Sequence, residues 1–445
     1  MKWLLEVFET DKSKTAFIHD DRTITYEKVI TTIADYSINI QDVGIKQYEI
    51  VAILGDYSPE VFCLILALAI NNNVIIPLAR ESVIERSDAL EISGCDWLIE
   101  FDKLDINFTI VKNKIPVKSK ILHDFKKMNS PGLVVFSSGS TGKPKAILHN
   151  FKHVAEKFKN KRNPIIAIPF LMIDHFGGIN TLLSITSSLG TLVTVKDRTS
   201  TNICSSIERY SVELLPTTPS FLTLLLASGN YKNFNLNSLI KVSYGTEVMP
   251  QSTLDRMKKI LPWAVFQQTY GLSEVGVLNS KSKDDGSLWV KVGGEGFDTK
   301  VVDNILFIKS KYAMVGYLNA PSGFDSEGWF NTQDQVEVDG DYFRILGRSS
   351  DIINVGGQKV YPAEIESLIL ELDNIFDVAV FGESHNLLGQ IVVAKVNLNN
   401  SENPQNIKKR IRQKFFGLVA NYKVPTKIIV SETPLHNFRQ KKIRK

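Results

Sequence analysis

The stretch VVFSSGSTGKPKAILHN, residues Val134–Asn150, places serine, glycine and threonine between two apolar segments. The flanking segments read as strands, and the small residues between them read as a loop. Successive backbone N–H groups in such a loop form a concavity that binds anions, and the hydroxyls and Lys145 add donors. The loop is not a Walker A motif, because two residues rather than four separate Gly139 from Gly142. A mobile surface loop is the alternative interpretation, since Ser/Gly runs are common in linkers.

Length and composition limit the class of protein. With 445 residues we expect two or more domains, and 43% hydrophobic with 22% charged residues is typical of a globular protein. The net charge of +4 and the lack of a basic face with interleaved aromatics argue against nucleic-acid binding. Three cysteines without paired spacing exclude a disulfide framework and a cysteine metal site, and they favour a cytoplasmic location.

No membrane segment is expected. The longest apolar run, Val61–Ile70, is about half a membrane span. It follows Ser-Pro-Glu, a plausible helix start with Ser58 as the N-cap, so it reads as a buried helix. The apolar run at the start is short and is broken by Glu6, which argues against a signal peptide.

The order of the elements predicts an α/β protein. A strand at Glu49–Gly55, a helix and a second strand suggest a parallel sheet with crossover helices, and the pattern repeats from Pro164–Phe170 to about residue 280. Short strands between Gly, Asp and Asn turns then predict an antiparallel, barrel-like region. A short α+β unit follows. We predict a large N-terminal domain, residues 1–348, and a small C-terminal domain, residues 349–445.

Four other stretches carry weaker signals. Thr269–Gly276 (TYGLSEVG) and Val242–Pro250 (VSYGTEVMP) follow strands, and open α/β sheets bind ligands at such strand ends. Gly328–Glu366 contains Asp334 and Arg348, and the chain closes with NFRQKKIRK. Each alone has an ordinary alternative: a tight turn, a solvated charge or a basic tail.

Together these stretches resemble the adenylate-forming superfamily, which comprises acyl- and aryl-CoA synthetases, peptide-synthetase adenylation domains and luciferases. SSGSTGKPK resembles the family's phosphate loop, YGLSE its Tyr-Gly-x-Thr/Ser-Glu motif, and YGTEVMP the stretch lining the adenine and acyl pockets. GWFNTQD resembles Trp-x-x-Thr-Gly-Asp, with Gln333 in place of glycine, and GRSSDIINVGGQKVYPAEIE resembles the hinge motif. The motifs stand in the family's order, and the resemblance runs from about Thr23 to the C-terminus.

The resemblance implies a fold and a reaction. The fold is a large N-terminal region of two α/β subdomains plus a small β-barrel, with a small α+β C-terminal domain that rotates as a lid. In the reaction, a carboxylate attacks the α-phosphate of ATP to give an acyl-adenylate and pyrophosphate. A thiol then displaces AMP and forms a thioester.

The resemblance also implies roles for single residues. Glu274 would hold Mg²⁺ and Ser273 would contact phosphate. Asp334 and Arg348 would bind the ribose, and Tyr270 would flank the adenine. The triphosphate is assigned to Ser137, Ser138, Gly139, Ser140, Thr141, Gly142 and Lys145, and the rest of the nucleotide pocket to Gly245, Thr246 and Gly271.

A lysine of the C-terminal domain usually reaches the α-phosphate and the attacking carboxylate, in a Gly-Lys-x-x-Arg motif. The spacing selects Lys441, although Gln440 replaces the glycine and Lys442 is an adjacent competitor. At the hinge this chain has Ser350 where most relatives have Asp or Lys. By resemblance, Gly356 and Gly357 would line the pantetheine tunnel in the rotated state.

Pro169–Leu182 falls where the family places an acyl-pocket motif. His175 matches the histidine that is common in acyl- and aryl-CoA synthetases. Asp174 lies one position from the aspartate with which amino-acid-activating relatives bind the substrate ammonium. A third interpretation is that both residues cap a helix beginning near Gly178, and all three remain open.

Three hypotheses about function follow. The first is an ATP-dependent ligase that activates a fatty or aromatic carboxylic acid as acyl-AMP and transfers it to CoA. The second is a stand-alone adenylation enzyme that loads an acyl or amino acid onto the phosphopantetheine thiol of a carrier protein supplied in trans. The third is a non-enzymatic nucleotide-binding regulator, which the altered positions Gln333 and Gln440 keep open.

Overall fold

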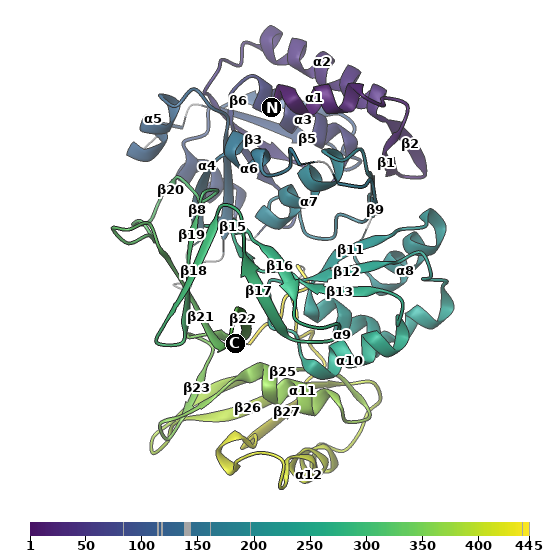
Figure 1. The fold of residues 1–445 in the computed structure, drawn as a ribbon, viewed down its shortest axis with the longest axis vertical. Helices are drawn as coiled ribbons and strands as arrows, with labels where there is room; N and C mark the ends of the chain where they lie inside the picture. The colour runs from purple at the N-terminus through teal and green to yellow at the C-terminus, as the bar shows by residue number, and fades with distance from the viewer. Residues whose placement is uncertain are drawn as a thin grey trace.

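Two mixed sheets form most of the large region (Figure 1). The structure is a computed structural model, and it describes every residue except 83, 114, 117–118, 138–143, 161, 196, 438 and 445. The first sheet has the order β20-β8-β7-β4-β3-β5-β6. Its strands are β3 (Ile50–Leu54), β4 (Val74–Leu78), β5 (Trp97–Phe101), β6 (Phe108–Lys112), β7 (Gly132–Ser137), β8 (Lys145–Asn150) and β20 (Gly316–Tyr317).

The second sheet has the order β13-β12-β11-β9-β10-β1-β2 and is parallel except for its pairing to β2. Its strands are β1 (Thr15–His19), β2 (Arg22–Thr25), β9 (Ile166–Ala167), β10 (Thr191–Val193), β11 (Leu214–Thr217), β12 (Lys241–Tyr244) and β13 (Val265–Gln268). Helices between parallel neighbours, such as α3 between β3 and β4, confirm the predicted crossover pattern.

Several helices of this region, α3 among them, begin at a residue whose side chain caps the first turn. The Ser58 side chain accepts a hydrogen bond from the Val61 N–H, Pro59 is the first helical residue, and the apolar run Val61–Ile70 is almost wholly buried, as predicted. Within the described residues, none of the helices combines the length and apolarity that a membrane crossing requires. The helices are α1 (Lys2–Glu9), α2 (Tyr26–Val43), α3 (Pro59–Ile70), α4 (Arg86–Ser93), α5 (Lys120–Lys126), α6 (Phe151–Glu156), α7 (Phe176–Thr186), α8 (Ser200–Tyr210), α9 (Pro219–Ser228), α10 (Gln251–Ile260) and the 3₁₀ helix η1 (Asn230–Asn233).

A third sheet is antiparallel throughout and has the order β16-β17-β22-β21-β19-β18. It occupies the segment for which the turn-rich sequence predicts an antiparallel, barrel-like region. Its strands are β16 (Asn279–Ser282), β17 (Trp289–Gly293), β18 (Phe297–Val302), β19 (Ile305–Ser310), β21 (Phe330–Asp339) and β22 (Tyr342–Arg348), and a short pair, β14 (Gly271–Leu272) and β15 (Gly276–Val277), precedes it.

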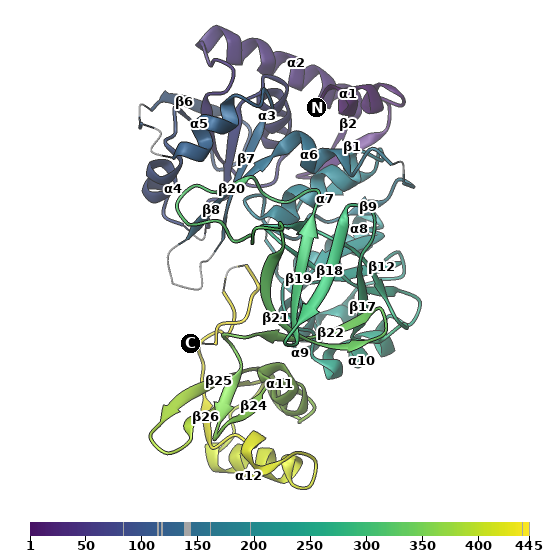
Figure 2. The same ribbon diagram turned by 60° about the vertical axis from the view of Figure 1, so that its left-hand side comes forward.

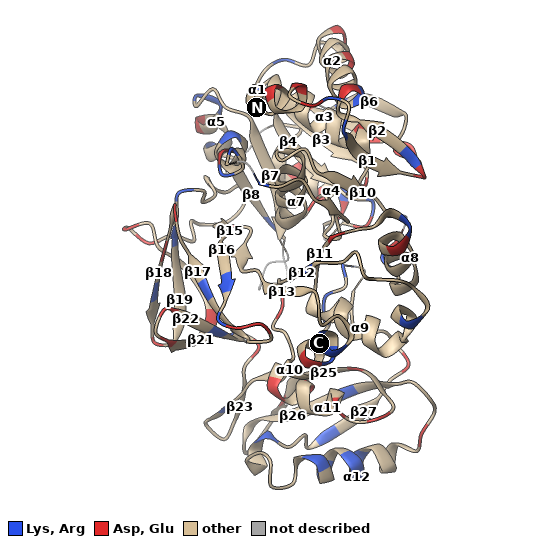
Figure 3. Cartoon of the chain, turned by 45° about the vertical axis from the view of Figure 1, so that its right-hand side comes forward, with Lys and Arg blue, Asp and Glu red and all other residues tan. Residues whose placement is uncertain are grey.

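A smaller α+β unit with its own hydrophobic core ends the chain. It holds β23 (Ile353–Val355), β24 (Gln358–Val360), α11 (Pro362–Leu370), β25 (Ile375–His385), β26 (Gly389–Leu398), α12 (Pro404–Phe415), the 3₁₀ helix η2 (Asn421–Lys423) and β27 (Lys427–Val430). Figure 3 shows α12 as the basic helix that the sequence predicts. The predicted α/β class with a smaller C-terminal unit is confirmed, while the boundary at Arg348 stays a prediction.

The last residues turn back from the small unit toward the large region (Figure 2). Thr218 Oγ1 donates to the carbonyl oxygen of Gln440 at 2.8 Å. A second contact joins α10 to α11, where the Ser252 N–H donates to Ser367 Oγ at 3.1 Å. These contacts fix where the final segment enters the large region.

Candidate active site

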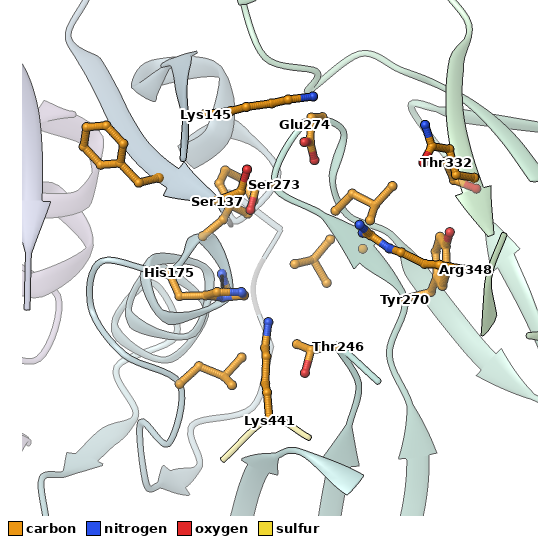
Figure 4. Close-up of a pocket in the computed structure, with 18 of the residues that line it drawn as sticks. Ser137, Lys145, His175, Thr246, Tyr270, Ser273, Glu274, Thr332, Arg348 and Lys441 are labelled. Carbon is orange, nitrogen blue, oxygen red and sulfur yellow. Dashed lines mark hydrogen bonds between the residues drawn. The ribbon is translucent and has the colours of Figure 1, made fainter. Parts of the chain in front are cut away.

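A cavity of about 350 Å³ lies where the large region meets the final segment (Figure 4). Strand ends of the first two sheets, the third sheet and the C-terminus all contribute to its wall. The labelled lining residues are Ser137, Lys145, His175, Thr246, Tyr270, Ser273, Glu274, Thr332, Arg348 and Lys441. Of the predicted site residues within the described chain, most lie here; Gly245 and Asp334 lie beside it, and Gly356 and Gly357 lie elsewhere.

The predicted phosphate loop begins and ends on a strand pair. Ser137 and Lys145 are opposite each other in the antiparallel pairing of β7 and β8. The loop residues Ser138, Gly139, Ser140, Thr141 and Gly142 lie outside the described residues, so their role stays a prediction. Lys145 Nζ lies 4.9 Å from the centroid of the Tyr317 ring.

Glu274 lies near this lysine. Its Oε1 atom accepts a hydrogen bond from the Tyr317 hydroxyl at 2.9 Å, and the side chain lines the cavity. Sequence reasoning missed Tyr317, because the two-residue strand β20 carries no motif. Among the described residues no group of three or more His, Cys, Asp or Glu could hold a metal ion. A single carboxylate still suits Mg²⁺, which proteins often bind through one or two carboxylates together with substrate phosphates.

Three of the predicted nucleoside residues, Tyr270, Asp334 and Arg348, contact one another. The Tyr270 hydroxyl donates to Asp334 Oδ2 at 2.5 Å, and Arg348 Nε lies 3.6 Å from Asp334 Oδ1. Burial raises the pKa of Asp334, which Tyr270 and Arg348 oppose. Asp334 lines a neighbouring cavity of about 150 Å³ that shares Thr246, Tyr270, Gly271 and Arg348 with the first. The ribose assignment therefore stays a prediction.

Two predicted glycines allow close backbone approach. A Cβ on Gly245 would lie 2.5 Å from Thr269 Oγ1, and a Cβ on Gly271 would lie 2.8 Å from the carbonyl oxygen of Gly276. Both distances are too short for real atoms. These positions therefore need glycine for the packing of the cavity wall, whatever the ligand.

Gln333 and Gln440 replace family glycines, yet both keep a left-handed backbone, with φ of 60° and 54°. That conformation costs a residue with a side chain about 1–2 kcal/mol. The amide oxygen of Gln440 is also buried without a hydrogen-bond partner among the described residues. Both glutamines thus occupy a backbone conformation that glycine adopts more readily.

Lys441 and Lys442 point to different places. Figure 4 shows the ammonium end of Lys441 in the cavity, between His175 and Thr246. Burial lowers the pKa of Lys441 to about 8, although Glu247 opposes the shift. Lys442 Nζ instead donates to Asp377 Oδ1 and to a carbonyl oxygen, both at 2.7 Å, within the small unit. The placement matches the Lys441 assignment and gives Lys442 a structural contact.

His175 lines the cavity and also caps α7. Its Nδ1 accepts a hydrogen bond from the Gly177 N–H at 3.0 Å. Burial lowers the pKa of His175 well below its usual value, so the ring is neutral. The helix-cap and pocket interpretations are therefore compatible for this residue.

Asp174 has a partner that sequence reasoning missed. Its Oδ2 atom pairs with Arg439 Nη2 at 2.5 Å and accepts from Ser82 Oγ at 2.9 Å, and both charged side chains are buried. Burial raises the pKa of Asp174, and the guanidinium opposes that shift. In this structure the Asp174 carboxylate neutralises the guanidinium of Arg439, from the C-terminal segment. The ammonium group of an amino-acid ligand would have to bind at that same carboxylate.

Gly356 and Gly357 lie apart from the cavity residues, at the exposed turn between β23 and β24. Their φ angles are 57° and 85°, and such tight hairpin turns favour glycine. The turn alone accounts for both glycines, and their role in a thiol tunnel stays a prediction.

Two family models match this chain. A family model described as AMP-binding enzyme matches residues 5–304, and a second, the AMP-binding enzyme C-terminal domain, matches residues 364–438. The chain belongs to the AMP-binding enzyme family. This confirms the superfamily that the motifs predict.

Individual relatives of this AMP-binding enzyme are CoA ligases. It is 31% identical over 327 residues to acyl-CoA synthetase 7 of Caenorhabditis elegans, covering 65% of this chain and 59% of that protein. It is 24% identical to indoleacetate–CoA ligase of Aromatoleum aromaticum, covering 96% and 93% of the two chains. The anthranilate CoA ligase AuaEII, solved with anthranoyl-AMP, has the same fold, with a TM-score of 0.84, 19% identity, and coverage of 99% of this chain and 95% of that one.

Substitutions of the two adjacent lysines should have different effects, one on activity and one on stability. We expect Lys441→Ala to abolish acid-dependent pyrophosphate exchange while leaving thermal unfolding nearly unchanged, because its side chain lines the cavity. Lys442→Ala should lower the free energy of unfolding by about 3 kcal/mol, because the buried Asp377 loses its lysine counter-ion. The carboxylate then keeps His436 Nδ1, at 3.9 Å, and the Val378 N–H. The side chains of Lys442 and Asp377 are only 6% and 2% exposed. A larger loss of exchange per folded molecule in Lys442→Ala would refute the assignment.

The lowered pKa of Lys441 predicts that activity in the exchange reaction falls at alkaline pH. In the free enzyme the ammonium charge is lost as pH rises through about 8. We expect kcat/KM for ATP in the exchange reaction to fall above that pH, since this parameter reports the free enzyme. Lys441→Arg should lack the fall because a guanidinium stays charged. An identical alkaline limb in both proteins would exclude Lys441 as its source.

The left-handed backbone at Gln440 predicts how two substitutions there change the thermal midpoint of unfolding. Gln440→Gly should raise the thermal midpoint, because relief of about 1–2 kcal/mol of strain exceeds the roughly 0.5–1 kcal/mol entropic cost of glycine. Gln440→Val should lower the midpoint, because a β-branched side chain fits this conformation poorly. Equal midpoints for all three proteins would show that the turn is unstrained.

Proposed function

We propose that the protein is an ATP-dependent acid–thiol ligase that activates a carboxylic acid as acyl-AMP and transfers the acyl group to CoA. The observation that carries this proposal is the placement of Lys441, from the C-terminal segment, in a cavity whose wall also holds Lys145 and Glu274. The named relatives are CoA ligases, which favours CoA over a carrier protein.

The site suits the first half-reaction because it can bring two anions together. Lys145 and Ser137 would bind the ATP phosphates, and Lys441 would attract both the α-phosphate and the attacking carboxylate. Glu274 would hold Mg²⁺, which would supply further neutralisation of phosphate charge. Neutral His175 adds no charge beside the acid. Positioning and electrostatic stabilisation account for most of the rate in such transfers.

The second half-reaction requires access for a thiol. We propose that residues 349–445 turn about Ser350, which withdraws Lys441 from the cavity. Ser350 is exposed and its hydroxyl bonds to the neighbouring Asp351. A turn there would have to break the hydrogen bond that the Asp351 N–H donates across it to the carbonyl oxygen of Arg348. The exposed turn at Gly356 and Gly357 would then approach the site. We also propose a cytoplasmic location, since Cys63, Cys95 and Cys204 are free and buried.

Pyrophosphate exchange into ATP tests the proposal. With Mg²⁺ and a panel of fatty, aryl and amino acids, we expect exchange with at least one acid and none with Lys441→Ala. Adding CoA or a phosphopantetheinylated carrier protein then identifies the acceptor, and we expect the acyl-CoA product. Absence of exchange across the panel would favour the regulator hypothesis. Transfer to the carrier alone would favour the second hypothesis.

A further inference from the structure

A third cavity, of about 840 Å³, adjoins the active-site cavity and shares Thr269 and Val277 with it. One wall is a face of the second sheet, where β11, β12 and β13 lie side by side (Figure 1). Pro216, Ser243 and Gln267 lie in one row across these strands, next to each other in register. Asn180, Thr181 and Ser184 of α7 line the cavity as well.

The two faces of this sheet differ in polarity. Alternate residues of a strand point to opposite faces. Leu215, Val242 and Phe266 are buried in a hydrophobic core on one face, whereas Lys241, Ser243 and Gln267 line the cavity on the other. A sheet face that only completed a core would carry apolar residues at these positions. Leu214 and Pro216 of the same face also line the cavity, so this face offers a ligand both polar and apolar contacts.

Five basic residues line this cavity; besides Lys159 and Lys311, they are three cations, Lys157, Arg162 and Lys241. Lys157 Nζ donates to Asn180 Oδ1 at 2.5 Å and to the carbonyl oxygen of Val277 at 3.1 Å. Burial, and then the neighbouring Arg162, lower the pKa of Lys157 to about 7, and the same two causes lower the pKa of Lys241. The guanidinium is thus close enough to repel both ammonium groups.

Within the described chain, no carboxylate forms a salt bridge with any of these three cations. The acidic residues that line the cavity are Glu156 and Glu295. Glu156 lies 3.9 Å from Lys159, and Glu295 is exposed at the rim. Lys157 and Lys241 are partly buried, whereas Arg162 is exposed and its Nη1 donates to Ser184 Oγ at 3.3 Å. Partly buried positive charge without a counter-ion is costly, and a bound anion would reduce that cost for the two lysines.

We propose that this cavity holds the part of the acid substrate remote from the reacting carboxylate, and that this part carries a second anionic group bound by Lys157, Arg162 and Lys241. The inference rests on the proposed function, because it assumes that the first cavity activates the carboxylate. Thr269 and Val277 belong to both cavities, so one molecule can extend from one into the other. A fatty chain would leave the three cations unpaired, whereas a dicarboxylic acid, aliphatic or aromatic, would pair them.

Pyrophosphate exchange without CoA tests the inference with matched acids. The panel holds aliphatic and aromatic dicarboxylic acids of increasing length, each beside its half methyl ester, which keeps the size and removes the second charge. We expect kcat/KM for the best diacid to exceed that of its half-ester by at least about tenfold, as expected for charge-assisted hydrogen bonds. Omitting CoA ensures that its own phosphates cannot produce the effect.

Variants of Lys241 locate the preference in this cavity. Lys241→Met should lower kcat/KM for the diacid by at least about tenfold and leave that for the half-ester within about twofold, since only the diacid loses a charged partner. Lys241→Arg should retain most of the preference. Lys152→Met is the matched control, because Lys152 is exposed and is not among the residues that line the cavity.

The outcomes separate the two proposals. Exchange with half-esters or fatty acids that equals or exceeds exchange with diacids would overturn this inference and leave the ligase intact. A diacid preference that Lys241→Met does not reduce would also overturn it. Exchange with no acid of either kind would overturn the proposed function, and this inference with it.

Discussion

The arrangement of the two parts of the chain depends on one constraint. The ammonium group of Lys441, from the final segment, is buried in a cavity that the large region mainly forms. A buried charge is unfavourable unless other groups fix and compensate it. Lys442 fixes the segment on one side, since its N–H donates to Glu247 Oε1 at 2.6 Å. On the other side Arg439 pairs with Asp174. The residues that flank Lys441 therefore hold it in place, and its ammonium group remains available to a ligand in the cavity.

The sequence alone predicts the convergence of the motifs well. Glycine, serine and carboxylate residues follow apolar strands, and strand ends of an open α/β sheet meet at one edge. Lys145, Thr246 and Glu274 do line one cavity. The pairing of Asp174 with Arg439 was not predictable, because the partners are 265 positions apart and neither belongs to a periodic pattern. The basic cavity was missed for a similar reason, since its cations come from separate segments and each alone resembles a surface charge.

The two positions that depart from the family motifs have a backbone conformation that a glycine could also adopt. Gln333 and Gln440 both occupy the backbone conformation that glycine favours. Local hydrogen bonds stabilise it: the Gln333 N–H donates to Asn331 Oδ1 at 2.8 Å, and the Gln440 N–H donates to the carbonyl oxygen of Asn437 at 2.9 Å. Intrinsic residue preferences could not reveal this, because neighbouring side chains and turns impose the φ angle. The regulator hypothesis loses most of its structural support.

The ion pair between Asp174 and Arg439 limits how freely the parts of this enzyme can be exchanged. Asp174 belongs to the large region, whereas its counter-ion belongs to the segment that carries Lys441. A C-terminal unit grafted from a homologue with a neutral residue in place of Arg439 would bury that carboxylate alone, at a cost of about 3–5 kcal/mol. Natural chimaeras and engineered hybrids would therefore have to inherit the acid and the guanidinium together.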